Sequence, residues 1–343
     1  MLKQHLPWQS HAWQQLFSTP AAWPHALLVY GPKGIGKFHF TQLAAQALLC
    51  ERPGRNFFPC GSCTSCYWCG QETHPDLKLL QPESLSQDDG EVRSGEDRGT
   101  RRPRQGGKQI SVGQVRELTG FMDLTAQCGG RKVVVVHPTE DLGVSAANAL
   151  LKTLEEPPRE TTFLLVSHRP HRIPPTVRSR CRLLPMHAPQ ANEGIAWLAE
   201  QGVAEPLLVL SEAGFAPLRA RDHSQGDYLK RRKDFLGRLA DDTLDPIEQA
   251  ATLDLTDLPE VLGWLQRWTY DLVANRLTGR KRYNLDFVVP LRRTAGRADV
   301  ARLGRFHRTL VTYQSNLAHP LNARLIFEHL FLSYLRCIPI QPW

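Results

Sequence analysis

Near the amino terminus a strand, a glycine-rich loop and a helix follow one another, and this succession restricts the fold more than any other feature. The apolar run Ala26–Tyr30 predicts a buried strand. Gly31–Lys37 forms the loop, and apolar residues at helical spacing then continue to about Cys50. Because such a unit opens nucleotide-binding α/β domains, we expect a parallel sheet with helices packed on it.

The loop matches the phosphate-binding pattern G-x-x-x-x-G-K-[ST] except at its last position. Glycines let backbone N–H groups turn toward phosphate oxygens, and the lysine neutralises the outer phosphates. The candidate nucleotide-binding residues are therefore Gly31, Gly34, Gly36 and Lys37. Phe38 stands where a hydroxyl should contact Mg²⁺. The pattern predicts a genuine phosphate loop with a damaged metal-binding function, so ATP binding by this chain is in doubt.

A second loss is found after the strand that should end in an aspartate that orders Mg²⁺. Four valines, Val133–Val136, are followed by His137 and Pro138, where an active ATPase would place aspartate and then glutamate. Neither histidine nor proline can hold hydrated Mg²⁺ or orient the attacking water. Two losses in one site predict that the isolated chain is not an ATPase.

Strands and helices alternate through residues 1–187, which predicts an α/β domain with a parallel sheet. Further strands are expected at Asp76–Leu80, Lys132–Val136, Thr162–Ser167 and Arg182–Leu184, with helices after the N-cap Ser111 and at Ser145–Glu155. Residues 86–108 hold one apolar residue, Val92, and predict a disordered insertion. Beyond residue 188 only helical patterns occur, at Ile195–Leu198, Pro206–Leu210, Leu258–Leu277, Asp299–Tyr313 and Asn322–Leu335.

Charge and hydropathy exclude some classes of protein. The chain has 42 lysines and arginines against 34 acidic residues, a net charge of +8, which is compatible with an acidic partner such as DNA but does not establish one. No apolar run approaches the ~18 residues of a membrane span. The first residues lack the basic and then apolar segments of a secretory signal. A cytoplasmic protein is therefore expected.

Five of the eight cysteines fall within twenty residues, at Cys50, Cys60, Cys63, Cys66 and Cys69. Disulfides of secreted proteins are instead spread through a short chain. Four thiolates complete a tetrahedron around Zn²⁺, and two cysteines three residues apart can hold one ion from a tight turn. A structural zinc site is the leading interpretation, with an iron–sulfur cluster as the alternative. Spacing alone does not choose four ligands among the five.

Three further segments carry a family resemblance. They are Thr73–Asp76, the run Asn148–Pro158 with its Leu-Glu-Glu-Pro-Pro ending, and the triplet Ser179-Arg180-Cys181. Together with the cysteine cluster and the altered phosphate loop, they resemble the clamp-loader branch of the AAA+ ATPases. Specific motifs support the resemblance over residues 1–187, whereas size and helical character support it beyond them.

The resemblance implies roles for individual residues. It selects Cys50, Cys60, Cys63 and Cys66 as zinc ligands and leaves Cys69 spare. It makes Arg180 an arginine finger that reaches the ATP of a neighbouring subunit. Arg219, a looser match, would be the nucleotide-sensing arginine of a lid domain. The implied domains are an AAA+ α/β domain (1–187) containing the zinc module (50–69), a small helical lid domain (188–230) and an all-α collar domain (231–343).

The function that this resemblance implies is that of a non-catalytic, stator-like clamp-loader subunit. It would join the motor (tau/gamma) subunits and the delta subunit in a pentameric ring that loads the sliding clamp onto primed DNA. One alternative is an autonomous ATPase of the same fold, a motor subunit or a helicase-like ring protein, which Phe38 and His137 argue against. Another is a zinc-dependent nucleic-acid-binding protein, although only Tyr67 and Trp68 supply aromatic rings within the cysteine module.

Overall fold

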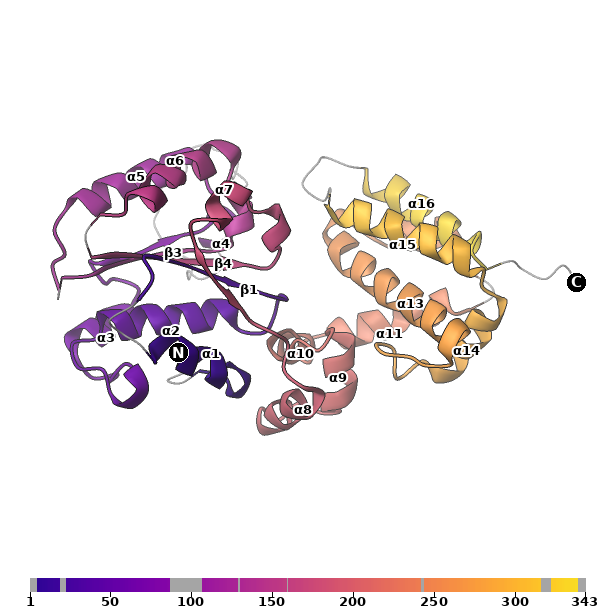
Figure 1. Cartoon of the computed structure of the whole chain (residues 1–343). Coiled ribbons are helices and arrows are strands. Elements are labelled where there is room, and N and C mark those ends of the chain that lie inside the picture. Colours follow the sequence, from indigo (N-terminus) through magenta and orange to yellow (C-terminus); the bar gives the residue numbers. More distant parts are fainter. Residues whose placement is uncertain are drawn as a thin grey trace, which may run out of the picture. The chain divides into compact units, whose positions relative to one another are not determined.

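The chain forms two compact units, Met1–Pro189 and Gln190–Trp343 (Figure 1). The computed structural model describes residues 5–18, 23–86, 107–128, 130–158, 160–241, 244–315 and 322–338. The bounds expected for the α/β domain, residues 1–187, stay a prediction. The lid–collar boundary expected near residue 230 falls inside the second unit and stays a prediction.

The first unit contains a sheet of five parallel strands in the order β2-β3-β4-β1-β5. Its register aligns Leu28 with Leu165 on one side and with Leu183 on the other. The sheet confirms the expected α/β fold with a parallel sheet. Its strands are β1 (Ala26–Tyr30), β2 (Leu77–Leu80), β3 (Lys132–Val136), β4 (Thr161–Ser167) and β5 (Arg182–Pro185).

Helices cover both faces of this sheet, which is why the central strands β3 and β4 are buried along their whole length (Figure 1). One face carries α1 (Ser10–Phe17), α2 (Lys37–Leu49) and α3 (Thr64–Gly70). The other carries α5 (Val112–Asp123), α6 (Val144–Glu155) and α7 (Pro175–Arg178). Ser111 caps α5 as expected, since its Oγ accepts a hydrogen bond from the Gln114 N–H at 3.3 Å.

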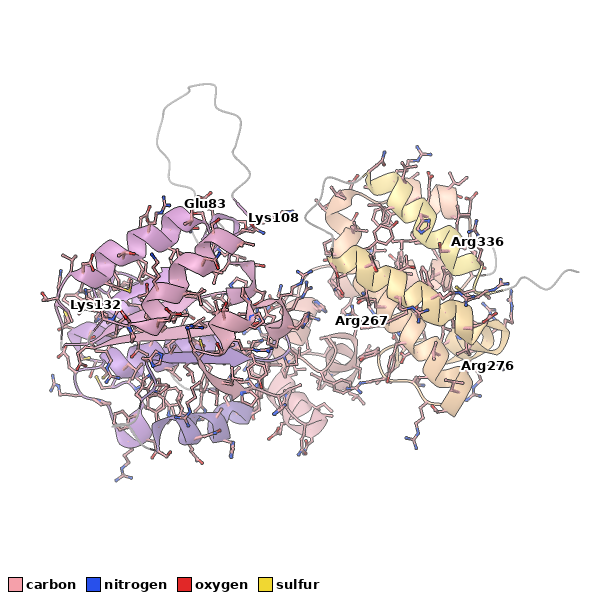
Figure 2. The ribbon with its side chains drawn as sticks, turned by 45° about the horizontal axis from the view of Figure 1, so that its top comes forward. Glu83, Lys108, Lys132, Arg267, Arg276 and Arg336 are labelled. Atoms are coloured by element: carbon pink, nitrogen blue, oxygen red, sulfur yellow. The ribbon has the colours of Figure 1, made fainter. Side chains whose placement is uncertain are left out.

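Most of the segment predicted to be a disordered insertion, residues 87–106, lies outside the described residues. The short helix α4 (Glu83–Ser86) precedes it. The Gly107 N–H donates to Glu83 Oε2 at 3.4 Å, so the chain on the two sides of the segment lies together (Figure 2 labels Glu83 and Lys108).

The second unit is helical throughout its described residues, as the sequence predicts. Its core is continuous from Tyr228 to Ile338 and includes Trp264, Trp268 and Phe331. No described helix is long and apolar enough to cross a membrane. The helices are α8 (Ala191–Glu200), α9 (Pro206–Glu212), α10 (Pro217–His223), α11 (Tyr228–Leu239), α12 (Pro246–Ala251), α13 (Leu258–Thr278), α14 (Val288–Arg297), α15 (Val300–Ser315) and α16 (Ala323–Leu335).

Candidate nucleotide and metal sites

The glycine-rich loop lies between the carboxyl end of β1 and the start of α2. Gly31 cannot be replaced without a shift, because a Cβ there would lie 2.0 Å from the carbonyl oxygen of Met186. Gly34 and Gly36 both have φ of 85°, a left-handed conformation that favours glycine. The three glycines therefore have conformational reasons to be glycine, whether or not a nucleotide binds.

Lys37, the expected phosphate-binding lysine, is turned onto its own loop. Its Nζ donates hydrogen bonds to the carbonyl oxygens of Gly31 (2.8 Å) and Pro32 (2.5 Å), and the residue is 2% exposed. The Gln9 side chain closes the loop from the other side, with Nε2 donating to the carbonyls of Ile35 (3.1 Å) and Gly36 (2.9 Å). A phosphate group would have to draw the ammonium away from two carbonyl oxygens.

Three aromatic side chains occupy the place where Mg²⁺ ligands are expected. The ring of Phe38 stacks on that of His137 with centroids 4.2 Å apart and planes 22° apart. His168 meets His137 edge-on at 5.5 Å. His137 directly follows β3 and His168 directly follows β4, so both stand at the carboxyl edge of neighbouring parallel strands.

Burial keeps both imidazoles neutral. Burial, followed by the charges of Lys37 and Lys33, lowers the pKa of His137 to about 4. Burial first, and then Lys37, lowers the pKa of His168 to about 3. The nearby carboxylate of Glu140 accepts a hydrogen bond from the backbone N–H of His168 (2.9 Å) and is thus held by β4. Mg²⁺ prefers oxygen ligands, and Phe38 and His137 offer none at the two expected positions.

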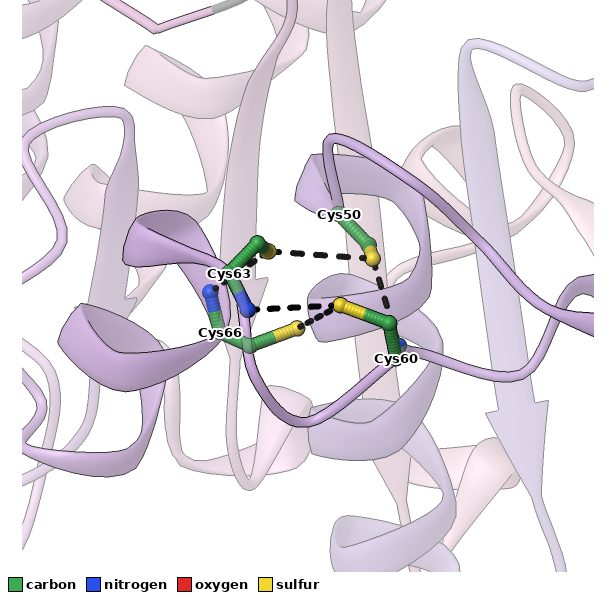
Figure 3. A group of neighbouring side chains, drawn as sticks. All are labelled: Cys50, Cys60, Cys63 and Cys66. Carbon is green, nitrogen blue, oxygen red and sulfur yellow. Dashed lines mark hydrogen bonds between the residues drawn. The ribbon is translucent and has the colours of Figure 1, made fainter.

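The cysteine cluster joins the end of α2 to the start of α3 (Figure 3). The sulfurs of Cys50, Cys60, Cys63 and Cys66 all lie within 4.8 Å of one another. The Cys50–Cys63 and Cys60–Cys66 pairs are separated by 3.9 and 4.0 Å. Four sulfurs arranged tetrahedrally at the Zn–S distance of about 2.3 Å would stand about 3.8 Å apart. The four residues could therefore hold a metal ion, and the buried Cys69 stands outside the group.

Backbone N–H groups point at three of these sulfurs. The N–H groups of Cys60, Cys63 and Cys66 lie 3.3–3.4 Å from the sulfurs of Cys50, Cys60 and Cys63. Hydrogen bonds from the backbone of Ser62 and Cys63 lower the pKa of the Cys60 thiol to about 6. Burial acts in the opposite direction and raises the pKa of Cys66. A cation would offset that burial and hold all four groups as thiolates.

A buried hydrogen-bond chain braces the cluster from behind. The backbone N–H of Asp76 donates to His74 Nδ1 at 3.0 Å, so the ring hydrogen is on Nε2, which lies 2.6 Å from Ser65 Oγ. Ser65 Oγ in turn donates to the carbonyl of Leu49 at 2.6 Å. Leu49 precedes the ligand Cys50, and Ser65 stands between two other ligands. The Thr73–Asp76 motif thus fixes both sides of the metal-binding turn.

Arg180 lies between α7 and β5, with its side chain 33% exposed. Its guanidinium pairs with Glu155 at the end of α6, and its Nη1 donates to the carbonyl of Thr176 at 2.8 Å. Arg178 is exposed on the preceding turn. Arg219 lies in the second unit, half-buried near Tyr228 and Glu212, where burial and the charge of Arg267 lower its pKa.

Sequence reasoning missed three contributors: the ring of His168, the Gln9 side chain and the Ser65 bridge. The signal for His168 was available, because it follows a buried strand just as His137 does. The other two depend on the packing of segments distant in sequence, and no local pattern marks them.

Comparison with known proteins identifies the family. A model described as DNA polymerase III, delta subunit, matches residues 8–190, and one for the C-terminal part of the delta subunit matches residues 226–335. The DNA polymerase III subunit delta′ of Pseudomonas aeruginosa is 38% identical over 279 residues, covering 79% of this chain and 78% of that protein. The chain belongs to the DNA polymerase III delta-prime subunit family.

A second curated relative agrees with this family assignment, whereas the likeness to solved structures is weaker. The delta-prime subunit of Escherichia coli K12 is 31% identical over 287 residues, which cover 82% of this chain and 79% of that protein. Among solved structures, a gamma-subunit-related protein of Thermotoga maritima matches 95% of this chain and 99% of its own, at 17% identity and a TM-score of 0.42. That structural score is too low to support any conclusion. Membership of the delta-prime family thus rests on sequence.

Proposed function

We propose that this chain is a non-catalytic, stator-like subunit of a cytoplasmic bacterial clamp loader. It would form a pentameric ring with motor (tau/gamma) subunits and a delta subunit, and would help to load the sliding clamp onto primed DNA. Its membership of the delta-prime family supports the clamp-loader assignment. The proposed absence of catalysis rests on this chain's own residues.

The stacking of Phe38 on His137 supports the absence of ATP hydrolysis. ATP hydrolysis needs Mg²⁺ bridging the β- and γ-phosphates, held by a hydroxyl of the loop and a carboxylate at the end of the next strand. Here the two positions hold rings in contact at 4.2 Å, and the imidazole is neutral because its pKa is about 4. The loop can still present backbone N–H groups, so the loss concerns the metal and not the loop itself.

We also propose that the metal is zinc and that its role is structural. Zn²⁺ bound by Cys50, Cys60, Cys63 and Cys66 would crosslink the end of α2 to the start of α3. Four thiolate ligands leave no open position for a substrate or an activated water, which is typical of a structural site. The sulfur spacing of 3.9–4.0 Å fits this coordination.

Arg180 is proposed as the finger that completes the ATP site of a neighbouring subunit. It lies on a short turn before β5 and is partly exposed, with Glu155 and the Thr176 carbonyl holding it. A planar guanidinium suits the equatorial oxygens of a transferring phosphoryl group. An otherwise inactive subunit could thereby still be needed for hydrolysis by the ring.

Steady-state ATPase assays on the zinc-loaded chain test the non-catalytic role. We expect turnover at background, and a rate near an ordinary value of about one per second would contradict the proposal. The double change Phe38→Ser, His137→Asp should recover little, because Pro138 also replaces the residue that orients water. Mixing the chain with candidate motor and delta subunits, and weighing the product by native mass spectrometry, tests assembly separately.

A further inference from the structure

The positive charge of the whole chain comes from one stretch of the second unit. Residues 276–315 contain ten of the 42 lysines and arginines but only two of the 34 acidic residues. The remainder of the chain therefore holds 32 residues of each sign, and its charges cancel. A surplus that is confined in this way is not a general property of a basic protein.

This stretch is gathered at one end of the helical bundle. It leads from the last turn of α13 through a loop and α14 into α15, and α13 packs against both α14 and α15. The end of α16 is brought to the same place, because Arg302 Nη1 donates to the carbonyl of Arg336 at 2.8 Å and the Asp299 N–H donates to that of Cys337 at 2.9 Å. Figure 2 labels Arg276 and Arg336 on this part of the unit.

The loop that carries part of the charge is held rigidly. Asp271 is fully buried, and its carboxylate accepts hydrogen bonds from the backbone N–H groups of Arg282 (2.7 Å), Tyr283 (2.9 Å) and Asn284 (2.7 Å). The conformation of this basic loop is therefore fixed by the buried core, and the cost of ordering it is already met before any ligand binds.

Half of these cations form no ion pair with any described residue. In the described part of the chain no ion pair or hydrogen bond involves the guanidinium group of Arg276, Arg280, Arg292, Arg305 or Arg308, and all five residues are exposed. The two acids of the stretch are paired with other residues: Asp286 pairs with the buried Arg232 at 2.7 Å, and Asp299 pairs with Arg302 at 3.5 Å. Of the five arginines, Arg305 lies near enough to feel the charge of Asp299, but forms no ion pair with it. The like charges at this end of the bundle repel one another unless an anion is near.

We propose that these five arginines form a surface that binds the sugar–phosphate backbone of DNA without reading its sequence. Nine of the ten cations are arginines, whose planar fork binds phosphate oxygens in pairs. Several exposed arginines without an ion-pair partner suit the closely spaced negative charges of a phosphate backbone. The proposal goes beyond the clamp-loader role and does not depend on the zinc site or on Arg180.

Fluorescence anisotropy with a labelled DNA duplex of about 30 base pairs tests it, using the zinc-loaded full chain between about 50 and 200 mM salt. The test variant is Arg292→Ala, Arg305→Ala, Arg308→Ala. The control variant removes the same charge from exposed positions of the first unit, Arg52→Ala, Arg55→Ala, Arg116→Ala. Melting curves should show that both variants fold.

Each lost phosphate contact reduces the magnitude of the slope of log K against log salt by about 0.9, where K is the association constant for DNA. The three substitutions of the test variant should therefore reduce the magnitude of that slope by roughly 2.7. We expect its affinity at the lowest salt to fall at least tenfold and that of the control variant less than twofold. Three results would overturn the proposal. They are no salt-dependent binding by the unaltered chain, an equal loss in both variants, or tighter binding of a glutamate-rich peptide of equal charge, which would assign the surface to an acidic protein.

Discussion

Phe38 lies in the first turn of α2 and His137 follows the end of β3, yet their rings stack on each other at the two positions where metal ligands are expected. Restoring one alone leaves a hydroxyl or a carboxylate facing an aromatic ring instead of a cation. The stack therefore explains the metal defect as one packing arrangement made by two residues. His168 extends it by a third ring at 5.5 Å from His137.

The stack should make stability depend on pH. His137 has a pKa of about 4 in the folded chain and about 6.5 when unfolded, so the unfolded state binds more protons between these values. Its contribution is complete above pH 6.5 and is lost as the pH falls toward 4. His137→Phe keeps a ring and removes this titration. Between pH 7 and pH 5 we expect the variant to lose about 2 kcal/mol less free energy of unfolding than the unaltered chain, as measured by urea titration with zinc in excess. Equal losses would contradict a buried neutral imidazole.

The zinc ligands can be tested residue by residue. Cys60→Ser should lose the metal, because a hydroxyl does not replace a thiolate in a site of four sulfurs. Cys69→Ala should retain about one zinc per chain, since its sulfur lies outside the cluster. Elemental analysis of both purified variants decides the assignment. Zinc loss from the Cys69 variant alone would show that the wrong four ligands were chosen.

Ser65 tests the bracing chain behind the metal. Ser65→Ala removes the donor to the buried carbonyl of Leu49 and the partner of His74, which should destabilise the zinc-loaded chain by about 1–3 kcal/mol. Zinc should also be lost faster to a chelator, by roughly tenfold, since residues that orient ligands affect metal affinity on this scale. Thr64→Ala, at the exposed neighbouring position, is the control and should change neither quantity. Equal chelation rates for the two variants would refute the brace.

At the scale of elements, buried Glu212 connects four helices. At the end of α9 it accepts hydrogen bonds from His223 Nδ1 (2.7 Å) and the Tyr228 hydroxyl (2.8 Å), and it pairs with Arg267 at 2.9 Å. Burial opposes its ionisation, but His223 and Arg267 outweigh burial and hold the pKa of Glu212 at about 2. The charge is therefore present at every pH at which the protein is ordinarily studied.

Removing that carboxylate should weaken the junction of α9, α10, α11 and α13. Glu212→Ala leaves Arg267 without its partner in a largely buried place, and we expect about 3 kcal/mol of destabilisation. Glu260→Ala breaks the Glu260–Arg231 pair, whose side chains are 34% and 40% exposed, and should cost less than about 1 kcal/mol. Chemical denaturation of the two variants measures the difference. A loss in Glu212→Ala no larger than in the control would mean that the cluster contributes little.

Strands and helices were predicted correctly where the local sequence pattern determines them. All five strands were found within about one residue, because apolar runs between loops have few alternatives in a sheet covered on both faces. Several helices were not predicted, among them α11, since four consecutive basic residues, Lys230–Lys233, obscure its apolar side. One of them, Arg232, is 2% exposed, and its partner Asp286 lies 54 residues away. Pairing over such a separation follows from the fold and leaves no local signal.

The residues of the candidate sites were likewise predicted only where a local sequence pattern marks them. The sequence alone marked the phosphate loop and its two defects, because those residues are adjacent or follow strands. It left five cysteines for four ligand positions, and a family resemblance rather than spacing chose among them. The inward turn of Lys37 and the pair of Arg180 with Glu155 required coordinates, because flexible side chains choose their partners only after the backbone is placed.

The two units of the molecule have different proposed roles. The first unit holds the altered phosphate loop, the metal cluster and the proposed finger. The second holds a large helical core and the confined positive charge. A variant in one unit can therefore be tested for its effect on the other task, which should be unaffected if the assignments are right. Arg180 is the hardest residue to test, because its effect on ATP hydrolysis can be measured only in an assembled ring.

Arg180→Ala should leave folding, zinc content and ring assembly intact, because the side chains of the Arg180–Glu155 pair are 33% and 48% exposed and such solvent-accessible pairs contribute about 1 kcal/mol or less. Hydrolysis of ATP by the ring should fall several-fold, short of the roughly 10³–10⁵ contributed by single fingers in GTPases, because other subunits supply fingers to the other sites. Arg180→Lys should rescue poorly, since an ammonium lacks the planar fork. Arg178→Ala, two residues earlier and exposed, is the matched control and should hydrolyse ATP at the unaltered rate. Equal ATPase and clamp-loading rates for Arg180→Ala, Arg178→Ala and unaltered rings, each verified as fully assembled, would return Arg180 to the role of an ordinary surface residue.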